Sequence, residues 1–242
     1  MPVALLPRIL AAALTAAAAV SVGTDEGRLM AEALALAPGM RVADVGAGDG
    51  EYTVMLAREV GAGGHVWATE VDTEALEKTR RRVAEAGHGN VTTVVGDQRE
   101  TGLPAGCCDA IFLRLVYHHF TEPPAMRRSL LHALRPGGRL AVVEVPPQSG
   151  WRRLEGVPDR GGHGIEKGEL EREMTAAGFE IVGRYPDWPG ESDGYCVVFR
   201  RPRGDRPPQP STISTTSRTK RATMVASSRS MRRASISERT SE

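Results

Sequence analysis

The chain has 242 residues, of which 40% are hydrophobic and 25% charged, and its formal net charge is +1. This length and composition suit one globular domain of moderate size, with enough apolar residues to bury a core without disulfides. Its cysteines, Cys107, Cys108 and Cys196, form neither a disulfide framework nor a zinc-binding cysteine pattern, so we expect reduced thiols in an intracellular protein.

The near-neutral total hides an uneven distribution of charge. Residues 201–242 contain ten Lys and Arg but three Asp and Glu, which leaves 21 basic and 27 acidic residues in 1–200. A mildly acidic body is unfavourable for binding nucleic acid, so we expect no nucleic-acid partner. Residues 202–242 are rich in Ser, Thr, Arg and Pro and lack hydrophobic periodicity, which predicts a disordered basic tail.

Residues 1–23 form an apolar extension, in which Leu5 to Val22 is mostly Ala, Leu and Val with Arg8 as its single charge. Three interpretations stay open: a signal-like segment, an alanine-rich helix, or upstream sequence included by a wrong start codon. No segment is apolar for long enough to make a convincing membrane span. We therefore expect a cytoplasmic protein, with secretion as the alternative, and a folded domain at residues 24–201.

From residue 24 onward, helix-like and strand-like patterns alternate. The first predicted helix, 25–37, is stopped by a Pro-Gly pair. Further helices are predicted at 51–60, from 73 to a stop at Gly87, at 125–134 and at 169–177, with strands at 41–45, 65–70, 91–95, 109–115, 140–145, 179–184 and 195–200.

This order predicts a doubly wound α/β sheet with helices on both faces. The apolar run Ala110–Leu113 is typical of a parallel strand that is covered on both sides. A Pro-Gly-Gly turn at 136–138 should lead into the fifth strand. Only a loop joins the last two strands, so that pair must be antiparallel.

The turn after the first strand carries glycines at 46, 48 and 50, a G-x-G-x-G spacing. The dinucleotide fingerprint requires glycine at position 51, where this chain has Glu51, and a carboxylate there would repel a pyrophosphate. The turn therefore favours a nucleoside cofactor without phosphates. An ordinary tight strand–helix turn is the alternative.

Carboxylates end three successive predicted strands, at Asp44, Glu70 and Asp97, and Arg114 ends the fourth. In an open α/β sheet, ligands bind outside the carboxyl ends of the strands. Three acids at this edge do not suit a phosphate pocket. They suit a ligand that carries an amine, a ribose diol and an adenine amino group.

Each polar group at this edge has a role that its chemistry suggests. Glu70 follows the last turn glycine by about twenty residues, the position for a bidentate bond to a ribose diol. We assign this role to Glu70 because Asp72 falls in the cap region of the next helix. Asp97 can accept from an adenine N–H, and Gln98 offers a donor or acceptor nearby. Asp44 can hold an ammonium group.

The backbone of the turn offers a complementary site. Amides of Ala47 and Gly48 lie at the start of a helix, where N–H groups favour a carboxylate. Glycine at 46 and 48 keeps side chains from blocking that approach.

Four segments resemble successive motifs of the class I S-adenosylmethionine-dependent methyltransferases: VADVGAGDGEYT, VWATEVD, VVGDQRETGLPAGCCDAIFLRLVYHHF and LRPGGRLAVVEV. The resemblance runs from about residue 25 to residue 200. It implies a Rossmann-like, mostly parallel seven-stranded sheet whose last strand is antiparallel, and S-adenosyl-L-methionine as cofactor. By resemblance, Asp44, Gly46 and Gly48 would touch the methionine part, Glu70 the ribose, and Asp97 with Gln98 the adenine, although a small residue is common at the position of Gln98.

The resemblance also implies a methyl transfer to a small-molecule acceptor. Methylases of amides and exocyclic amines carry an Asn/Asp-Pro-Pro-aromatic run after the fourth strand, whereas this chain has Arg114-Leu115-Val116-Tyr117 there. A base is needed only if the acceptor must lose a proton. The candidates are His118 and His119, which leave the fourth strand, and His163 on a glycine-rich loop.

Structural roles compete with these catalytic ones, since His118 and His119 could serve only as helix-entry residues. Two adjacent histidines and a distant one do not form a metal site by spacing, and no carboxylate completes a triad in the sequence, so we expect no metal. Aromatic residues that could wall an acceptor pocket are Tyr117, Trp151, Trp188 and Tyr195.

Two other functions stay open. One is a module that binds S-adenosylmethionine without turnover. The other is a nicotinamide oxidoreductase, which Glu51 and the antiparallel final pair disfavour.

Overall fold

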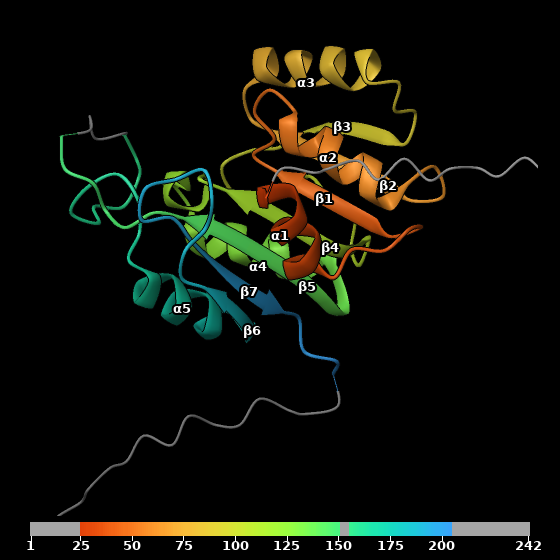
Figure 1. Ribbon diagram of the computed structural model, residues 1–242. Helices are drawn as coiled ribbons and strands as arrows, with labels where there is room; N and C mark the ends of the chain where they lie inside the picture. Colours follow the sequence, from red (N-terminus) through yellow and green to blue (C-terminus); the bar gives the residue numbers. More distant parts are fainter. Residues whose placement is uncertain (1–24, 151–154, 205–242) are drawn as a thin grey trace, which may run out of the picture. The chain divides into compact units, whose positions relative to one another are not determined.

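The computed structural model describes residues 25–150 and 155–204 (Figure 1). The expected apolar extension at 1–23 and all but the first three residues of the expected basic tail lie outside this part of the chain. The helices are α1 (Asp25–Leu34), α2 (Glu51–Val60), α3 (Thr73–Glu85), α4 (Pro123–Ala133) and α5 (Lys167–Ala176), with a short 3₁₀ turn, η1 (Tyr117–His119). The strands are β1 (Arg41–Val45), β2 (His65–Glu70), β3 (Val91–Val95), β4 (Cys108–Arg114), β5 (Leu134–Glu144), β6 (Glu180–Tyr185) and β7 (Tyr195–Arg200).

The strands form one seven-stranded sheet in the order β3-β2-β1-β4-β5-β7-β6. Neighbours from β3 through β5 are parallel, and β7 is antiparallel to both β5 and β6. The predicted doubly wound α/β fold with an antiparallel last strand is therefore confirmed. The strand order reverses beside β1, which is where such sheets bind ligands.

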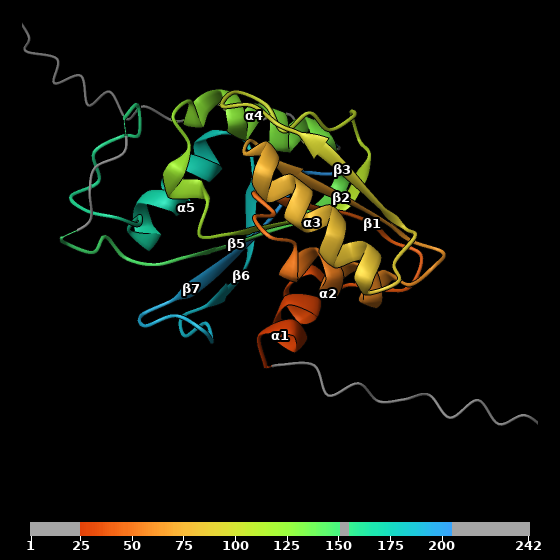
Figure 2. The ribbon, with the colours of Figure 1, turned by 90° about the horizontal axis from the view of Figure 1, so that it is seen from above.

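Helices cover both faces of the sheet, α1 to α3 on one side and α4 with α5 on the other (Figure 2). Successive strand residues point to opposite faces. Accordingly, Val42, Ala110 and Phe112 pack with α1 and α2. Ala43, Ile111 and Leu113 pack with α4 and α5. The apolar run in β4 is thus buried on both sides, as its sequence predicts.

Most predicted boundaries agree with the structure, and the largest difference is at β5. The expected Pro-Gly-Gly turn at 136–138 lies inside β5, which begins at Leu134. The ladder with β4 is irregular there, because Cys108 pairs with Leu134 while Ala110 pairs with Arg139. The turn residues are therefore accommodated as a bulge rather than as a break before the strand.

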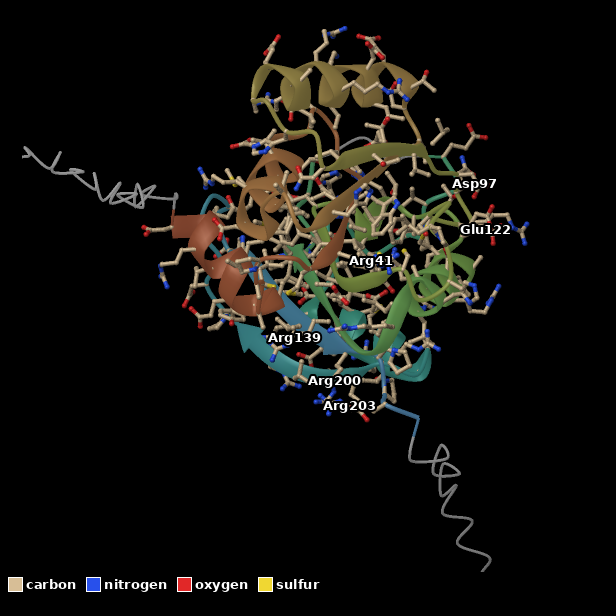
Figure 3. All side chains as sticks on the ribbon, turned by 90° about the vertical axis from the view of Figure 1, so that its right-hand side faces the viewer. Arg41, Asp97, Glu122, Arg139, Arg200 and Arg203 are labelled. Carbon is tan, nitrogen blue, oxygen red and sulfur yellow. The ribbon has the colours of Figure 1, made fainter. Side chains whose placement is uncertain are left out.

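Arginines gather at the edge of the sheet where β1 begins, and Arg135 and Arg200 form ion pairs there with Asp109 and Glu180. Figure 3 looks at the edge where Arg41 begins β1 and Arg200 ends β7, with Arg139 and Arg203 nearby. The acids at the ends of β1 and β2 and after β3 lie at the opposite edge.

Cys107, Cys108 and Cys196 are buried and form no disulfide. No helix within residues 25–150 and 155–204 has the length and hydropathy needed to cross a bilayer.

Candidate functional site

The glycine turn after β1 leaves room above its backbone. Gly46 has a φ of 77° and Gly48 a φ of 56°, both in the left-handed region that favours glycine. A Cβ added at Gly46 would lie 2.5 Å from Cγ2 of Val116, whereas one added at Gly48 would meet no atom within 4 Å. Gly46 therefore lets the segment after β4 approach the turn, and Gly48 faces open space.

Glu70, at the end of β2, is held beside this turn by three backbone amides. Its Oε2 accepts from the Gly48 N–H (3.0 Å), and its Oε1 accepts from the N–H groups of Val71 (2.8 Å) and Asp72 (3.2 Å). Asp72 caps α3 by accepting from the Glu74 N–H at 2.8 Å. The expected division of roles between Glu70 and Asp72 agrees with this geometry.

The sequence predicts that the Ala47 and Gly48 amides face a ligand carboxylate, but in the structure both donate to groups of the protein. The Ala47 N–H donates to the Thr69 carbonyl at 3.0 Å, and the Gly48 N–H donates to Glu70. Both donors that the sequence offers to a ligand carboxylate are thus already paired. A role of Ala47 and Gly48 as carboxylate donors stays a prediction that requires these bonds to exchange.

Asp44 lies beneath the turn. Its side chain is buried, and its Oδ2 accepts from the Thr53 hydroxyl at 2.6 Å. The pKa of Asp44 is raised to about 6, because burial and, to a smaller extent, the nearby Glu70 charge outweigh the lowering effect of the Thr53 hydrogen bond. A cation placed against Asp44 would therefore relieve an unfavourable buried charge.

Asp97 and Gln98 follow β3 on the exposed rim of the site. The Asp97 Oδ1 accepts from the N–H groups of Arg99 (2.6 Å) and Glu100 (2.8 Å), and these bonds hold the pKa of Asp97 below its usual range. The Gln98 Oε1 accepts from the Thr121 hydroxyl at 2.9 Å. Asp97 is thus a preorganised acceptor, and Gln98 links the end of β3 to the segment before α4.

Several of these groups border one hollow, which we call the acid-lined cavity. Its lining includes Glu70, Asp97, Gln98, Val116, His119 and Thr121, whereas Asp44, Ala47 and Gly48 lie outside the lining. The lining thus combines acceptor groups with the apolar surface of Val116. Val116 and Thr121 escaped the sequence analysis, because nothing in their residue type separates them from ordinary loop positions.

Arg114 lies away from this cavity. Its Nε donates to Glu26 and its Nη2 to Glu191, both at 2.8 Å, and its guanidinium stacks over Tyr52. It lines neither this cavity nor the one described below. The geometry gives Arg114 a role in joining α1, β4 and the turn before β7, and its predicted contact with the cofactor has no support from these positions.

The three candidate histidines lie together. The Nε2 of His163 is 3.1 Å from the Nε2 of His118 and 2.9 Å from the Nε2 of His119. The Nδ1 of His118 lies 2.6 Å from the Oε2 of Glu144, and the His118 backbone N–H donates to its Oε1 at 3.2 Å. His118 and Glu144 are buried, and the other two rings are half-buried.

Glu144 is a carboxylate partner of these histidines that the sequence analysis missed, since no carboxylate completes a triad in the sequence itself. It ends β5, which lies beside β4 in the sheet, so its side chain reaches the ring that follows β4. A signal was present in the sequence, because Glu144 is a charged residue in the otherwise apolar run Leu140–Val145. Spacing along the chain could not reveal the contact.

Burial and mutual repulsion favour neutral rings. Burial, together with smaller contributions from the neighbouring His118 and His163, lowers the pKa of His119 to about 4. Burial and His118 also lower the pKa of His163, although Glu144 opposes this shift. Both rings are therefore uncharged at neutral pH, each with one nitrogen lone pair available.

A second hollow, which we call the histidine-lined cavity, opens beside the cluster. Its lining includes His118, His119, Gln148, Asp159, Arg160 and His163. His119 lines both cavities. The two spaces therefore meet at the histidines that follow β4.

The aromatic candidates do not line either cavity. The Tyr117 hydroxyl donates to Glu173, that of Tyr195 to the Ile165 carbonyl, and the Trp188 indole N–H to Glu26. All three are buried, so they anchor the fold. Trp151 lies outside the described residues.

Comparisons with known proteins find similarity to methyltransferases. Residues 42–138 match the family model of the methyltransferase domain. The sheet order with its antiparallel β7 agrees with the fold that the resemblance to class I S-adenosylmethionine-dependent methyltransferases implies. The chain's individual relatives span a range of named activities.

The ubiquinone/menaquinone biosynthesis C-methyltransferase UbiE of Vibrio cholerae is 33% identical over 108 residues, which are 44% of this chain and 42% of that protein. The nocamycin O-methyltransferase of Saccharothrix syringae is 33% identical over 113 residues, 46% of this chain and 40% of the relative. The chain therefore matches less than half the length of either. A crystal structure of a SAM-dependent methyltransferase from Aquifex aeolicus aligns with a TM-score of 0.61 at 24% identity, over 73% of this chain and 89% of the other, which supports the fold.

Proposed function

We propose that this protein transfers the methyl group of S-adenosylmethionine to a small-molecule acceptor. The observation that carries the proposal is that the acid-lined and histidine-lined cavities share His119. A cofactor in the first cavity and an acceptor in the second would have adjoining reactive ends. Methyl transfer needs that arrangement, because the acceptor atom must approach in line with the bond that breaks.

The residues of the acid-lined cavity fit this cofactor. Glu70 keeps acceptor lone pairs for a ribose diol while three amides orient it. Asp97 and Gln98 would meet the adenine, and Asp44 would offset a positive charge from below the turn. Gly46, Ala47 and Gly48 would border the methionine part, where the space over Gly48 is open.

S-adenosylmethionine, when bound, supplies an activated methyl group on a sulfonium sulfur. The chain has then to orient the acceptor, exclude water and accommodate the proton that an O–H or N–H acceptor loses. His118, His119 and His163 lie where that proton is lost. Glu144 contacts the Nδ1 of His118, so the Nε2 of that ring is the nitrogen directed toward the cluster.

A small-molecule acceptor has two independent supports. The curated relatives include proteins named for quinone biosynthesis and for nocamycin. The mildly acidic body of residues 1–200 is unfavourable for nucleic acid. We also propose a folded domain at 24–201 with extensions on either side, and action on a cytoplasmic metabolite.

The experiment is to incubate the full chain with methyl-labelled S-adenosylmethionine and a host-cell extract, then separate small molecules, protein and nucleic acid. We expect label in the small-molecule fraction, and markedly less of it with a Glu70→Ala variant as control. Label in protein or nucleic acid would contradict the acceptor class. Tight cofactor binding without any labelled product would favour a binding module.

A further inference from the structure

The histidine cluster has the geometry of a metal site. The candidate ligand nitrogens of His118, His119 and His163 all lie within 4.8 Å of one another. A tetrahedral zinc ion binds histidine nitrogens at about 2.0–2.1 Å, which places two such nitrogens roughly 3.3 Å apart. The separations of His163 Nε2 from the other two Nε2 atoms, 3.1 and 2.9 Å, are close to that value.

Hydrogen bonds alone do not account for this convergence. A neutral ring nitrogen carries either one proton or one lone pair. His163 Nε2 faces two ring nitrogens at hydrogen-bond distance, so it can form one good bond with only one of them. A cation accepts a lone pair from each ring and satisfies all three at once.

We propose that His118, His119 and His163 bind one divalent transition-metal cation of the zinc class, through nitrogens that meet where the two cavities join. Imidazole ligands suit zinc, copper, iron and nickel, whereas calcium and magnesium prefer oxygen. The site is assigned from its own geometry and does not depend on the proposed methyl transfer.

Glu144 strengthens the assignment. Metal-binding histidines usually donate their other ring N–H to a carboxylate, which fixes the tautomer and raises the basicity of the ligand nitrogen. The buried Glu144 accepts from His118 Nδ1 at 2.6 Å and receives the backbone N–H of the same residue. This contact orients the ring so that His118 Nε2 is directed at the other two rings.

Three protein ligands leave a fourth position open, as in catalytic zinc sites. Since all three rings line the histidine-lined cavity, that position faces the space proposed for the acceptor. An acceptor hydroxyl placed there would release its proton to water more readily. Its oxygen lone pair would form the new O–CH₃ bond, and the pair from the C–S bond would return to sulfur. This consequence, an oxygen acceptor, rests on the proposed function.

The test is calorimetric titration of the untagged, chelator-treated full chain with Zn²⁺ alone. We expect one Zn²⁺ per chain with a Kd below about 1 μM, the affinity range of a site with several protein ligands. His119→Ala and His163→Ala should each weaken binding at least ~100-fold. His88→Ala and His132→Ala, which lie outside the cluster, are matched controls and should bind as the unmodified chain does.

Two results would overturn the site: no stoichiometric binding by the unmodified chain, or equal losses in the control variants. Cobalt in place of zinc gives a second readout, because removal of one ring should change its visible spectrum. Titration with S-adenosylmethionine in the absence of metal tests the proposed function separately. Zinc binding without cofactor binding would contradict the methyl transfer and leave the metal site standing.

Discussion

The acid-lined and histidine-lined cavities lie at the same edge of one sheet but are assembled differently. In the first, the acidic side chains Glu70 and Asp97 end a strand or lie in the turn directly after it. In the second, His118 meets Glu144 across 26 residues and His163 across 45. Under the proposed function, the residues assigned to the cofactor and also His118 and His119 lie within the matched family segment, 42–138, whereas Glu144 and His163 lie beyond it.

The substitution His118→Ala distinguishes most clearly between a catalytic role of the histidine-lined cavity and cofactor binding in the acid-lined cavity. We expect turnover to fall by roughly 10²–10⁴, the range for a group that assists proton transfer, while the Kd for S-adenosylmethionine changes less than about twofold. Steady-state kinetics and calorimetry give the two values. Equal losses in both would make His118 a structural residue.

His118→Ala removes the ring that contacts the buried Glu144 carboxylate, so Glu144→Gln serves as a second variant. Its amide oxygen can still accept from His118 Nδ1. Turnover should fall less than in His118→Ala, with the thermal unfolding midpoint nearly unchanged.

A second prediction concerns the buried Asp44 beneath the glycine turn and its effect on the free energy of unfolding. The pKa of Asp44 is about 6 when folded, against an ordinary value near 3.9. The folded state therefore holds this proton more tightly, and the free energy of unfolding falls as pH rises from about 4 to 6. Asp44→Asn keeps an acceptor for Thr53 and removes that loss, so it should stabilise the chain by about 3 kcal/mol at pH 7.

Urea unfolding of the cofactor-free chain at pH 4 and pH 7 measures this effect. The gain should vanish near pH 4, and the exposed Asp187→Asn should show none at either pH. A destabilised Asp44→Asn chain at pH 7 would contradict the assignment of an unfavourable buried charge.

Glu70→Ala tests the cofactor side directly. Loss of hydrogen bonds to a charged group should weaken S-adenosylmethionine binding by roughly 1.5–3 kcal/mol. Calorimetry on the folded variant gives the change in Kd. Asp72→Ala, which removes a helix cap instead, should lower stability and leave the Kd close to that of the unmodified chain. An unchanged Kd in Glu70→Ala would remove Glu70 from the ribose role.

The smallest effect is expected for Arg114→Ala. This residue bridges Glu26 and Glu191, so the change should cost about 2 kcal/mol of unfolding free energy, as for hydrogen bonds to charged groups. Cofactor affinity should hold. A lower affinity with unchanged stability would restore the cofactor contact that the sequence suggests for Arg114.

The difference between the two cavities also explains which features could be predicted from the sequence. The order of elements and the strand-end acids follow from local patterns, because the carboxyl ends of parallel strands share one edge. The bulge in β5 escaped prediction, since Pro and Gly signal a turn whether or not the ladder continues around it. Glu144 and the convergence of the histidines depend on strand neighbours and on the path of the 155–166 loop. Neither is encoded in residue spacing.

The most direct test is a crystal structure of the full chain with S-adenosylhomocysteine, the product that methyl transfer leaves behind. We expect its ribose against Glu70, its adenine by Asp97, and its sulfur directed at the junction beside His119. Density for the compound elsewhere, or a site that prefers a nicotinamide dinucleotide in competition, would contradict the account.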